Sequence, residues 1–191
     1  MKKLSMLLLT LVCAFALAAC GGAETDAESA DVTSTNGVIT VTPAEGFTAE
    51  VSESYEMIIL RPEGADSLQS NYIEIEGPGP EGYAFSFEFY TTTDEKIYLY
   101  DKDLPYSLEM LRADIETYNT NYPGIFSEPT ELTIGSYTYY RCDCVTNGED
   151  SYYYFTVVDE KPYTVSVVGG DLLDVDGDAV TQMMESLVFT Y

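Results

Sequence analysis

The chain has no histidine and no tryptophan, and it has only 8 lysines and arginines against 33 aspartates and glutamates in 191 residues. Without histidine it cannot use a Ser-His-Asp or Cys-His nucleophile, a histidine general base or a histidine-ligated zinc ion. A net charge of −25 also argues against nucleic acid, whose binding depends on lysine and arginine at phosphates. What is present, a hydrophobic content of 46%, is enough for one packed domain.

The N-terminus has the parts of a secretory signal. Lys2 and Lys3 precede an apolar run over residues 7–17, which is too short to span a membrane as a helix. The run ends in the sequence LAACG at residues 17–21. This sequence resembles the lipobox of bacterial lipoproteins, in which small residues admit the signal peptidase and the cysteine becomes the lipidated first residue.

The resemblance implies a signal peptide over residues 1–19 and a lipid on Cys20, so that Cys13 is discarded. An ordinary secretory signal followed by a chance cysteine is the alternative. Removal of two lysines leaves 6 basic and 33 acidic residues, a net charge of −27, which anionic headgroups repel. We therefore expect the lipid tether, and not the protein surface, to hold the domain at the membrane. The expected location is the outer face of a Gram-positive cell membrane rather than a periplasm. Residues 20–36 are acidic after the cysteine, without apolar periodicity, and predict a flexible linker.

Short strands are predicted from residue 37 onward, because apolar and polar residues alternate with period 2. The predicted strands cover residues 38–41, 57–60, 72–76, 85–90, 97–100, 137–145, 152–158, 163–168 and 188–191. Asn147-Gly148 is a strong signal for a hairpin turn, so residues 137–168 are expected to form a three-stranded antiparallel meander.

One long helix is predicted over residues 104–122, and a short one over residues 180–187. The apolar residues of the long helix are spaced by three and four, which places them on one stripe; they are Leu104, Leu108, Leu111, Ile115, Tyr118 and Tyr122. Asp103 is predicted to cap this helix, with Pro105 in its first turn, and Pro123-Gly124 ends it. Its length would be about 25–28 Å.

These elements predict a single α+β domain over residues 37–191, in which the long helix and the short C-terminal helix cover an antiparallel sheet. The order of strands, long helix, meander, short helix and terminal strand resembles the PsbP/DcrB-like group of small α/β sandwich proteins. An ending like residues 183–189 is part of the resemblance. It implies a binding or assembly module and carries no catalytic residue with it.

A calcium site is the strongest local motif. Asp174, Asp176, Asp178 and Glu185 occupy positions 1, 3, 5 and 12 of an EF-hand-type loop. The pattern departs from the EF-hand at position 6, where Ala179 replaces glycine, and no helix precedes the loop. The alternative interpretation is that Asp176 or Asp178 caps the last helix.

Cys142 and Cys144 are two residues apart on a predicted strand, so they share a face with Tyr140. Such residues lie nearly 7 Å apart, at the limit of disulfide reach. Two small core residues are one interpretation; a strained disulfide or a C-x-C redox pair is the other, although no cation on that face would activate a thiol.

Tyrosine is abundant, with 17 residues. An aromatic ledge for a sugar, a peptide or a partner protein is one interpretation, and half-buried strand packing is the other. The set considered for the ledge is Tyr98, Tyr100, Tyr137, Tyr139, Tyr152 and Tyr154. Glycoside hydrolysis by a pair of carboxylates is a further possibility, because the chain has 33 acids from which a pair could come. The same abundance means that the sequence singles out no particular pair.

The sequence thus predicts a membrane-anchored extracytoplasmic lipoprotein that acts as a non-enzymatic binding or assembly module. Its expected partners are the membrane, through the N-terminal lipid, and an envelope protein, peptide or carbohydrate. The alternatives are a weak enzyme, either an acid-pair hydrolase or a thiol oxidoreductase, and a calcium-dependent structural module.

Overall fold

The computed structural model describes residues 30–66, 69–78, 86–87, 97–98 and 105–190. These residues form an α+β fold, as predicted, with helices α1 (Leu108–Asn121) and α2 (Asp178–Ser186) and antiparallel sheets. The strands are β1 (Val32–Thr33), β2 (Ile39–Val41), β3 (Phe47–Val51), β4 (Met57–Pro62), β5 (Tyr72–Glu76), β6 (Ser86–Phe87), β7 (Ile97–Tyr98), β8 (Thr130–Ile134), β9 (Tyr137–Thr146), β10 (Glu149–Val158), β11 (Lys161–Val168) and β12 (Val188–Phe189).

The main sheet has seven strands in the order β3-β4-β5-β11-β10-β9-β8. The predicted meander is confirmed as β9-β10-β11. Its turns are Asn147-Gly148, with φ of 55° and 91°, and Asp159-Glu160, with φ of 49° and 63°; positive φ at both residues is what a two-residue type I′ turn requires. Pairing of β11 with β5 joins the meander to the N-terminal strands.

Three strands, β1, β3 and β8, are not predicted by the sequence pattern. Each is short, and their exposed residues interrupt the apolar alternation. Of the strands predicted at residues 85–90 and 97–100, the structure describes only β6 and β7, which pair with each other. The remainder of those two predictions lies outside the described residues.

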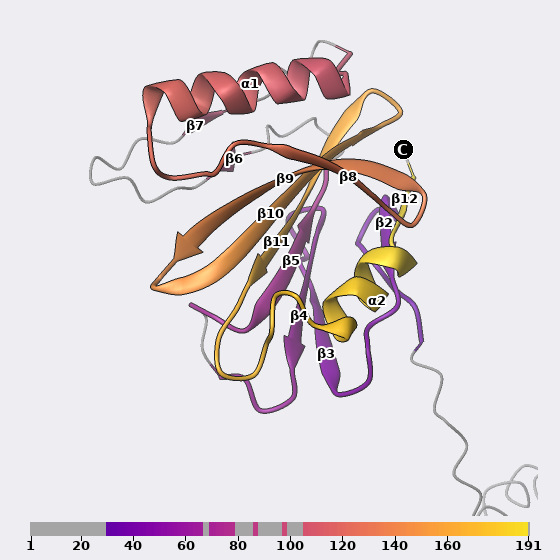
Figure 1. Cartoon of the computed structure of the whole chain (residues 1–191). Coiled ribbons are helices and arrows are strands. Elements are labelled where there is room, and N and C mark those ends of the chain that lie inside the picture. Colours follow the sequence, from indigo (N-terminus) through magenta and orange to yellow (C-terminus); the bar gives the residue numbers. More distant parts are fainter. Residues whose placement is uncertain (1–29, 67–68, 79–85, 88–96, 99–104, 191) are drawn as a thin grey trace, which may run out of the picture.

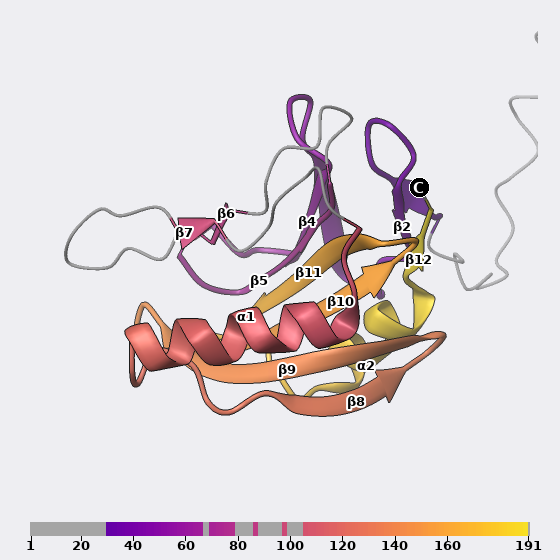
Figure 2. The ribbon, with the colours of Figure 1, turned by 90° about the horizontal axis from the view of Figure 1, so that it is seen from above.

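The two faces of the main sheet carry different covers (Figure 1). Helix α2 and the small sheet β1-β2-β12 lie on one face, and α1 lies on the other, across β9 and β10 (Figure 2). The core between the sheet and α2, here called the α2-side core, includes Ile39, Val41, Ile58, Leu60, Ile73, Ile75, Tyr139, Val165, Val167, Val180, Met183, Met184 and Phe189. The α1-side core consists of Tyr106, Leu111, Ile115, Tyr118, Phe126, Tyr140, Cys142 and Phe155.

Helix α1 is shorter than predicted. It has 14 residues instead of the range 104–122, and its N-cap is Ser107, whose side chain accepts a hydrogen bond of 3.2 Å from the N–H of Met110. Pro105 therefore precedes the cap and is not in the first turn, while Asp103 and Leu104 lie outside the described residues. The predicted stripe is confirmed at its centre, since Leu111, Ile115 and Tyr118 are buried.

The folded part begins before residue 37. Strand β1 lies within the predicted linker and pairs with β2. Residues 34–36 are also held by the buried carboxylate of Glu56, which accepts hydrogen bonds from the Ser34 hydroxyl at 2.6 Å and from the Asn36 N–H at 3.1 Å. The signal peptide and residues 20–29 lie outside the described residues. No helix within the described ranges is long and apolar enough to span a membrane.

Candidate functional site

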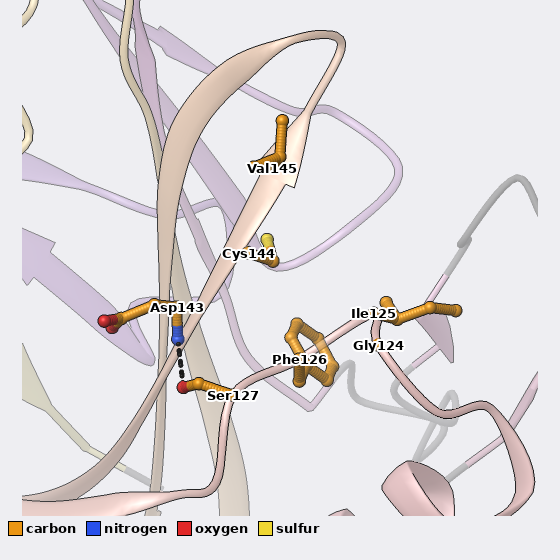
Figure 3. Close-up of a pocket in the computed structure, with 7 residues that line it drawn as sticks. All are labelled: Gly124, Ile125, Phe126, Ser127, Asp143, Cys144 and Val145. Carbon is orange, nitrogen blue, oxygen red and sulfur yellow. Dashed lines mark hydrogen bonds between the residues drawn. The ribbon is translucent and has the colours of Figure 1, made fainter.

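A pocket of about 450 Å³ opens between β9 and the connection from α1 to β8 (Figure 3). Its walls are formed by Gly124, Ile125, Phe126, Ser127, Asp143, Cys144 and Val145. Phe126 is almost fully buried against the rings of Tyr118, Tyr153 and Phe155. At the opposite wall, the side chain of Val145 is 68% exposed.

The pocket exists because β8 is half as long as β9. Strand β8 pairs only with residues 137–141 of β9. One more contact follows: the N–H of Ser127 donates to the carbonyl oxygen of Asp143 at 2.9 Å, and the N–H of Asp143 donates to the Ser127 hydroxyl at 2.9 Å. Beyond this point the connection turns toward α1, and Val145 is left at the surface.

Cys142 and Cys144 lie on the α1 side of β9 together with Tyr140, as the strand periodicity predicts. Both are free thiols. Burial, with a smaller contribution from the charge of the neighbouring Asp143, raises the pKa of Cys142 to about 12. Burial also raises the pKa of Cys144, against the small opposing effect of the Thr146 hydroxyl, which lies 3.6 Å from Sγ. Both thiols are therefore protonated at neutral pH and are poor nucleophiles.

Asp143, the acidic residue that borders the pocket, forms an ion pair with Arg141. The Asp143 carboxylate lies 2.9 Å from Nε of Arg141, and the Arg141 guanidinium lies over the ring of Tyr152 at 4.3 Å from its centroid. Figure 3 shows this carboxylate pointing away from Cys144 and Phe126. The side chains of Ile125, Phe126 and Val145 are thus the apolar part of a lining that also contains polar groups.

The predicted calcium ligands are not brought together. Asp174 accepts a hydrogen bond of 3.1 Å from the N–H of Asp176, and Asp176 accepts one of 2.9 Å from the hydroxyl of Tyr152. Asp178 begins α2 whereas Glu185 is in its last turn, about 10 Å further along the axis at 1.5 Å per residue. Within the described ranges, no three aspartate, glutamate or cysteine residues are close enough to hold a metal ion.

The alternative interpretation of these acids also needs correction. The N-cap of α2 is Gly177, and it has no side-chain cap hydrogen bond. Neither Asp176 nor Asp178 therefore caps the helix, although Asp178 lies in the first turn, where a negative charge is favourable.

The four tyrosines of the predicted ledge whose side chains the structure describes do not form an exposed aromatic surface. Tyr139 and Tyr154 are buried, and their rings meet edge to face at 6.1 Å within the α2-side core. Tyr137 and Tyr152 are half-buried beside them. Tyr100 and the side chain of Tyr98 lie outside the described residues.

Sequence patterns single out neither Phe126 nor Val145. Both look like ordinary apolar residues in the sequence, and they become pocket walls only because β8 stops pairing before the end of β9. The sequence also does not identify which of its many acids have a raised pKa, and the structure shows two of them. Burial raises the pKa of Glu74 on β5, against the lowering effect of Arg61, and burial raises the pKa of Asp114 on α1.

No protein-family model matches the chain, and no curated protein matches it. Among solved structures, it is similar to cyanobacterial PsbP (CyanoP) from Synechocystis sp. PCC 6803, with 12% identity and a TM-score of 0.44 over 91% of this chain and 99% of that one. It is also similar to a protein from Bacteroides thetaiotaomicron VPI-5482, with 10% identity and a TM-score of 0.47 over 86% of this chain. The match spans about half of that protein, 49%. At these identities the similarities say nothing about activity.

Proposed function

We propose that the protein is a lipid-anchored extracytoplasmic module that binds a partner and catalyses no reaction. The anchor is the lipid on Cys20, which the LAACG sequence supports. Cys20 is followed closely by β1 at Val32, so at most about 40 Å of extended chain separates the lipid from the fold. The binding module would then stand close to the membrane surface.

The observation that carries the binding proposal is the pocket beside β9. Its lining includes the apolar side chains of Ile125, Phe126 and Val145, its thiol is protonated, and its carboxylate is paired with Arg141. Apolar side chains beside the polar groups of the lining favour contact with an apolar side chain of a partner. They supply no activated nucleophile or general base.

Assignment to the PsbP/DcrB-like sandwich group is part of this proposal. It is supported by the element order, in which α1 precedes the meander and α2 precedes the terminal strand β12. Membership would agree with a role in binding or assembly.

Site-specific photocrosslinking in living cells tests the pocket. A photoreactive phenylalanine derivative in place of Val145 should give a discrete crosslinked product. The same residue in place of Val188, which is 50% exposed on β12 away from the pocket, is the matched control. If Val145 gives no product beyond that of Val188, the pocket is not a binding site.

Fractionation tests the anchor separately. Cys20→Ser should move the protein from the membrane fraction to the soluble fraction, because the lipid is the expected anchor. Recovery of the Cys20→Ser protein in salt-washed membranes would contradict lipid anchoring, whatever the crosslinking result.

A further inference from the structure

Strand β3 is an open edge of the main sheet. It is one of the two outermost strands and, among the described residues, it pairs only with β4 (Figure 1). Thr48, Ala49 and Glu50 are exposed along it. No residue of β3 has the positive φ of a bulge, and none is proline, so the backbone is extended and accessible.

The hydrogen bonds at both ends of β3 show which backbone groups face outward. The carbonyl of Gly46 accepts from the N–H of Glu63 at 2.7 Å, and the N–H of Ser52 donates to the carbonyl of Met57 at 3.0 Å. Since alternate residues bond across an antiparallel pair, residues 48 and 50 also bond to β4. Phe47, Ala49 and Val51 therefore point their N–H and C=O groups away from the sheet.

Most of these outward groups have no partner among the described residues. The N–H of Phe47 donates to Ala44 at 3.1 Å. The carbonyl of Phe47 and both backbone groups of Ala49 and Val51 remain, spaced by two residues, or about 7 Å. This is the pattern that an added strand can bond to.

The negative charge around β3 indicates which kind of partner strand could pair with it. Glu45, Glu50, Glu53 and Glu63 surround β3 and are exposed. Arg61 is the first basic residue after Lys3, and it lies over the ring of Tyr72 at 5.2 Å. A second copy of this chain would bring its own glutamates to the same edge, and the repulsion would oppose pairing.

We propose that β3 receives an extended, lysine- or arginine-rich segment of a partner protein, which adds to the main sheet as a further strand. The carbonyl of Phe47 and the backbone groups of Ala49 and Val51 supply the hydrogen bonds. The four glutamates favour cationic side chains at alternate positions of the segment. This surface belongs to a different edge of the sheet from the pocket and does not depend on it.

The probe is a fluorescein-labelled peptide of alternating valine and lysine, titrated by fluorescence anisotropy against the full lipid-anchored chain in a neutral detergent. A peptide with glutamate in place of lysine is the charge control and should not bind. Raising the salt concentration from 50 to 300 mM should weaken binding of the lysine peptide several-fold, because exposed charges are screened.

Ala49→Pro tests strand addition itself. Proline removes the outward N–H of residue 49 without removing a β3–β4 hydrogen bond, a position at which edge strands tolerate it. The expected result is a Kd at least tenfold higher. Thr133→Pro is the matched control, since residue 133 occupies an outward position on β8, the other edge, and it should leave the Kd unchanged.

An unchanged Kd in Ala49→Pro would show that the peptide is held by charge alone and would overturn the proposal. Loss of binding in Thr133→Pro, with Ala49→Pro unaffected, would assign the peptide to β8 and would also overturn it. The double variant Glu45→Gln with Glu50→Gln leaves the backbone hydrogen-bonding groups unchanged. It tests the proposal even if the Ala49→Pro variant does not fold. This double change should raise the Kd about threefold to tenfold at 50 mM salt, and no change would contradict the proposal.

Discussion

The two faces of the main sheet are both covered, but they are built from different residues. The α2-side core is mainly aliphatic and receives side chains from β4, β5 and β11 as well as from α2 and the small sheet. The α1-side core is smaller, mainly aromatic, and covered by one helix. The pocket opens beside this second core, at Phe126 and Cys144. The comparison predicts that the larger α2-side core contributes more to stability than the α1-side core, beside which the pocket lies.

The largest expected effect is on the α2 side. Ile58 is fully buried between β4 and its neighbours. Ile58→Ala should lower the free energy of unfolding by about 3–5 kcal/mol, because it removes buried methyl groups and leaves a cavity. Urea unfolding measures the loss. A loss below about 1 kcal/mol would place the stability of the protein elsewhere.

A smaller effect is expected from Leu111→Ala on α1. Leu111 is buried, but it packs in the smaller cluster beneath a single helix. The expected loss is about 2–4 kcal/mol in the same urea experiment. A loss larger than that of Ile58→Ala would reverse the comparison between the two faces.

The thiols of the α1 side give a pH-dependent prediction. Cys144 should react with iodoacetamide more slowly than a cysteine in an unfolded peptide at pH 8, because its raised pKa keeps it protonated. The rate should rise with pH, and Cys144→Ser should leave the native protein almost unlabelled, since Cys142 is fully buried. Labelling of native protein at the peptide's rate would contradict the raised pKa.

The raised pKa of Cys142 also predicts a change of stability with pH. Well below the reference cysteine pKa of about 8.5, the thiol is protonated in both the folded and the unfolded chain, so it has no effect. Between there and pH 12, the unfolded chain releases the proton but the folded chain retains it up to a pKa of about 12. Stability should therefore fall as the pH rises through this range. Cys142→Ala should reduce the fall.

The smallest expected effect concerns calcium. Because Glu185 lies at the far end of α2 from Asp178, we expect calcium and magnesium to raise the melting temperature equally, by screening the acidic surface. Differential scanning calorimetry with each ion at equal millimolar concentration measures the difference. If calcium raises the melting temperature more than magnesium does, and if this difference disappears in the double variant Asp176→Asn with Glu185→Gln, the prediction of a calcium site would be correct after all.

Local patterns in the sequence are confirmed where neighbouring residues decide the outcome. The Asn147-Gly148 turn, the meander, the central stripe of α1 and the shared face of Cys142 and Cys144 are of this kind. The start of α1 is predicted wrongly because Asp103, Pro105 and Ser107 all suit a helix start, and the sequence does not choose among them.

The sequence by itself determined the composition-based exclusions, the period-2 strands and the apolar face of α1, because each depends on residues within one element. Only the tertiary structure decided that β11 pairs with β5, as in Val165 against Ile75. The same holds for the edge position of β3 and for the end of β8 before the end of β9. The candidate binding surfaces belong to this second group. The physical reason is that a strand edge and a pocket are defined by which distant segments pair and where that pairing stops, and no residue in the local sequence specifies this.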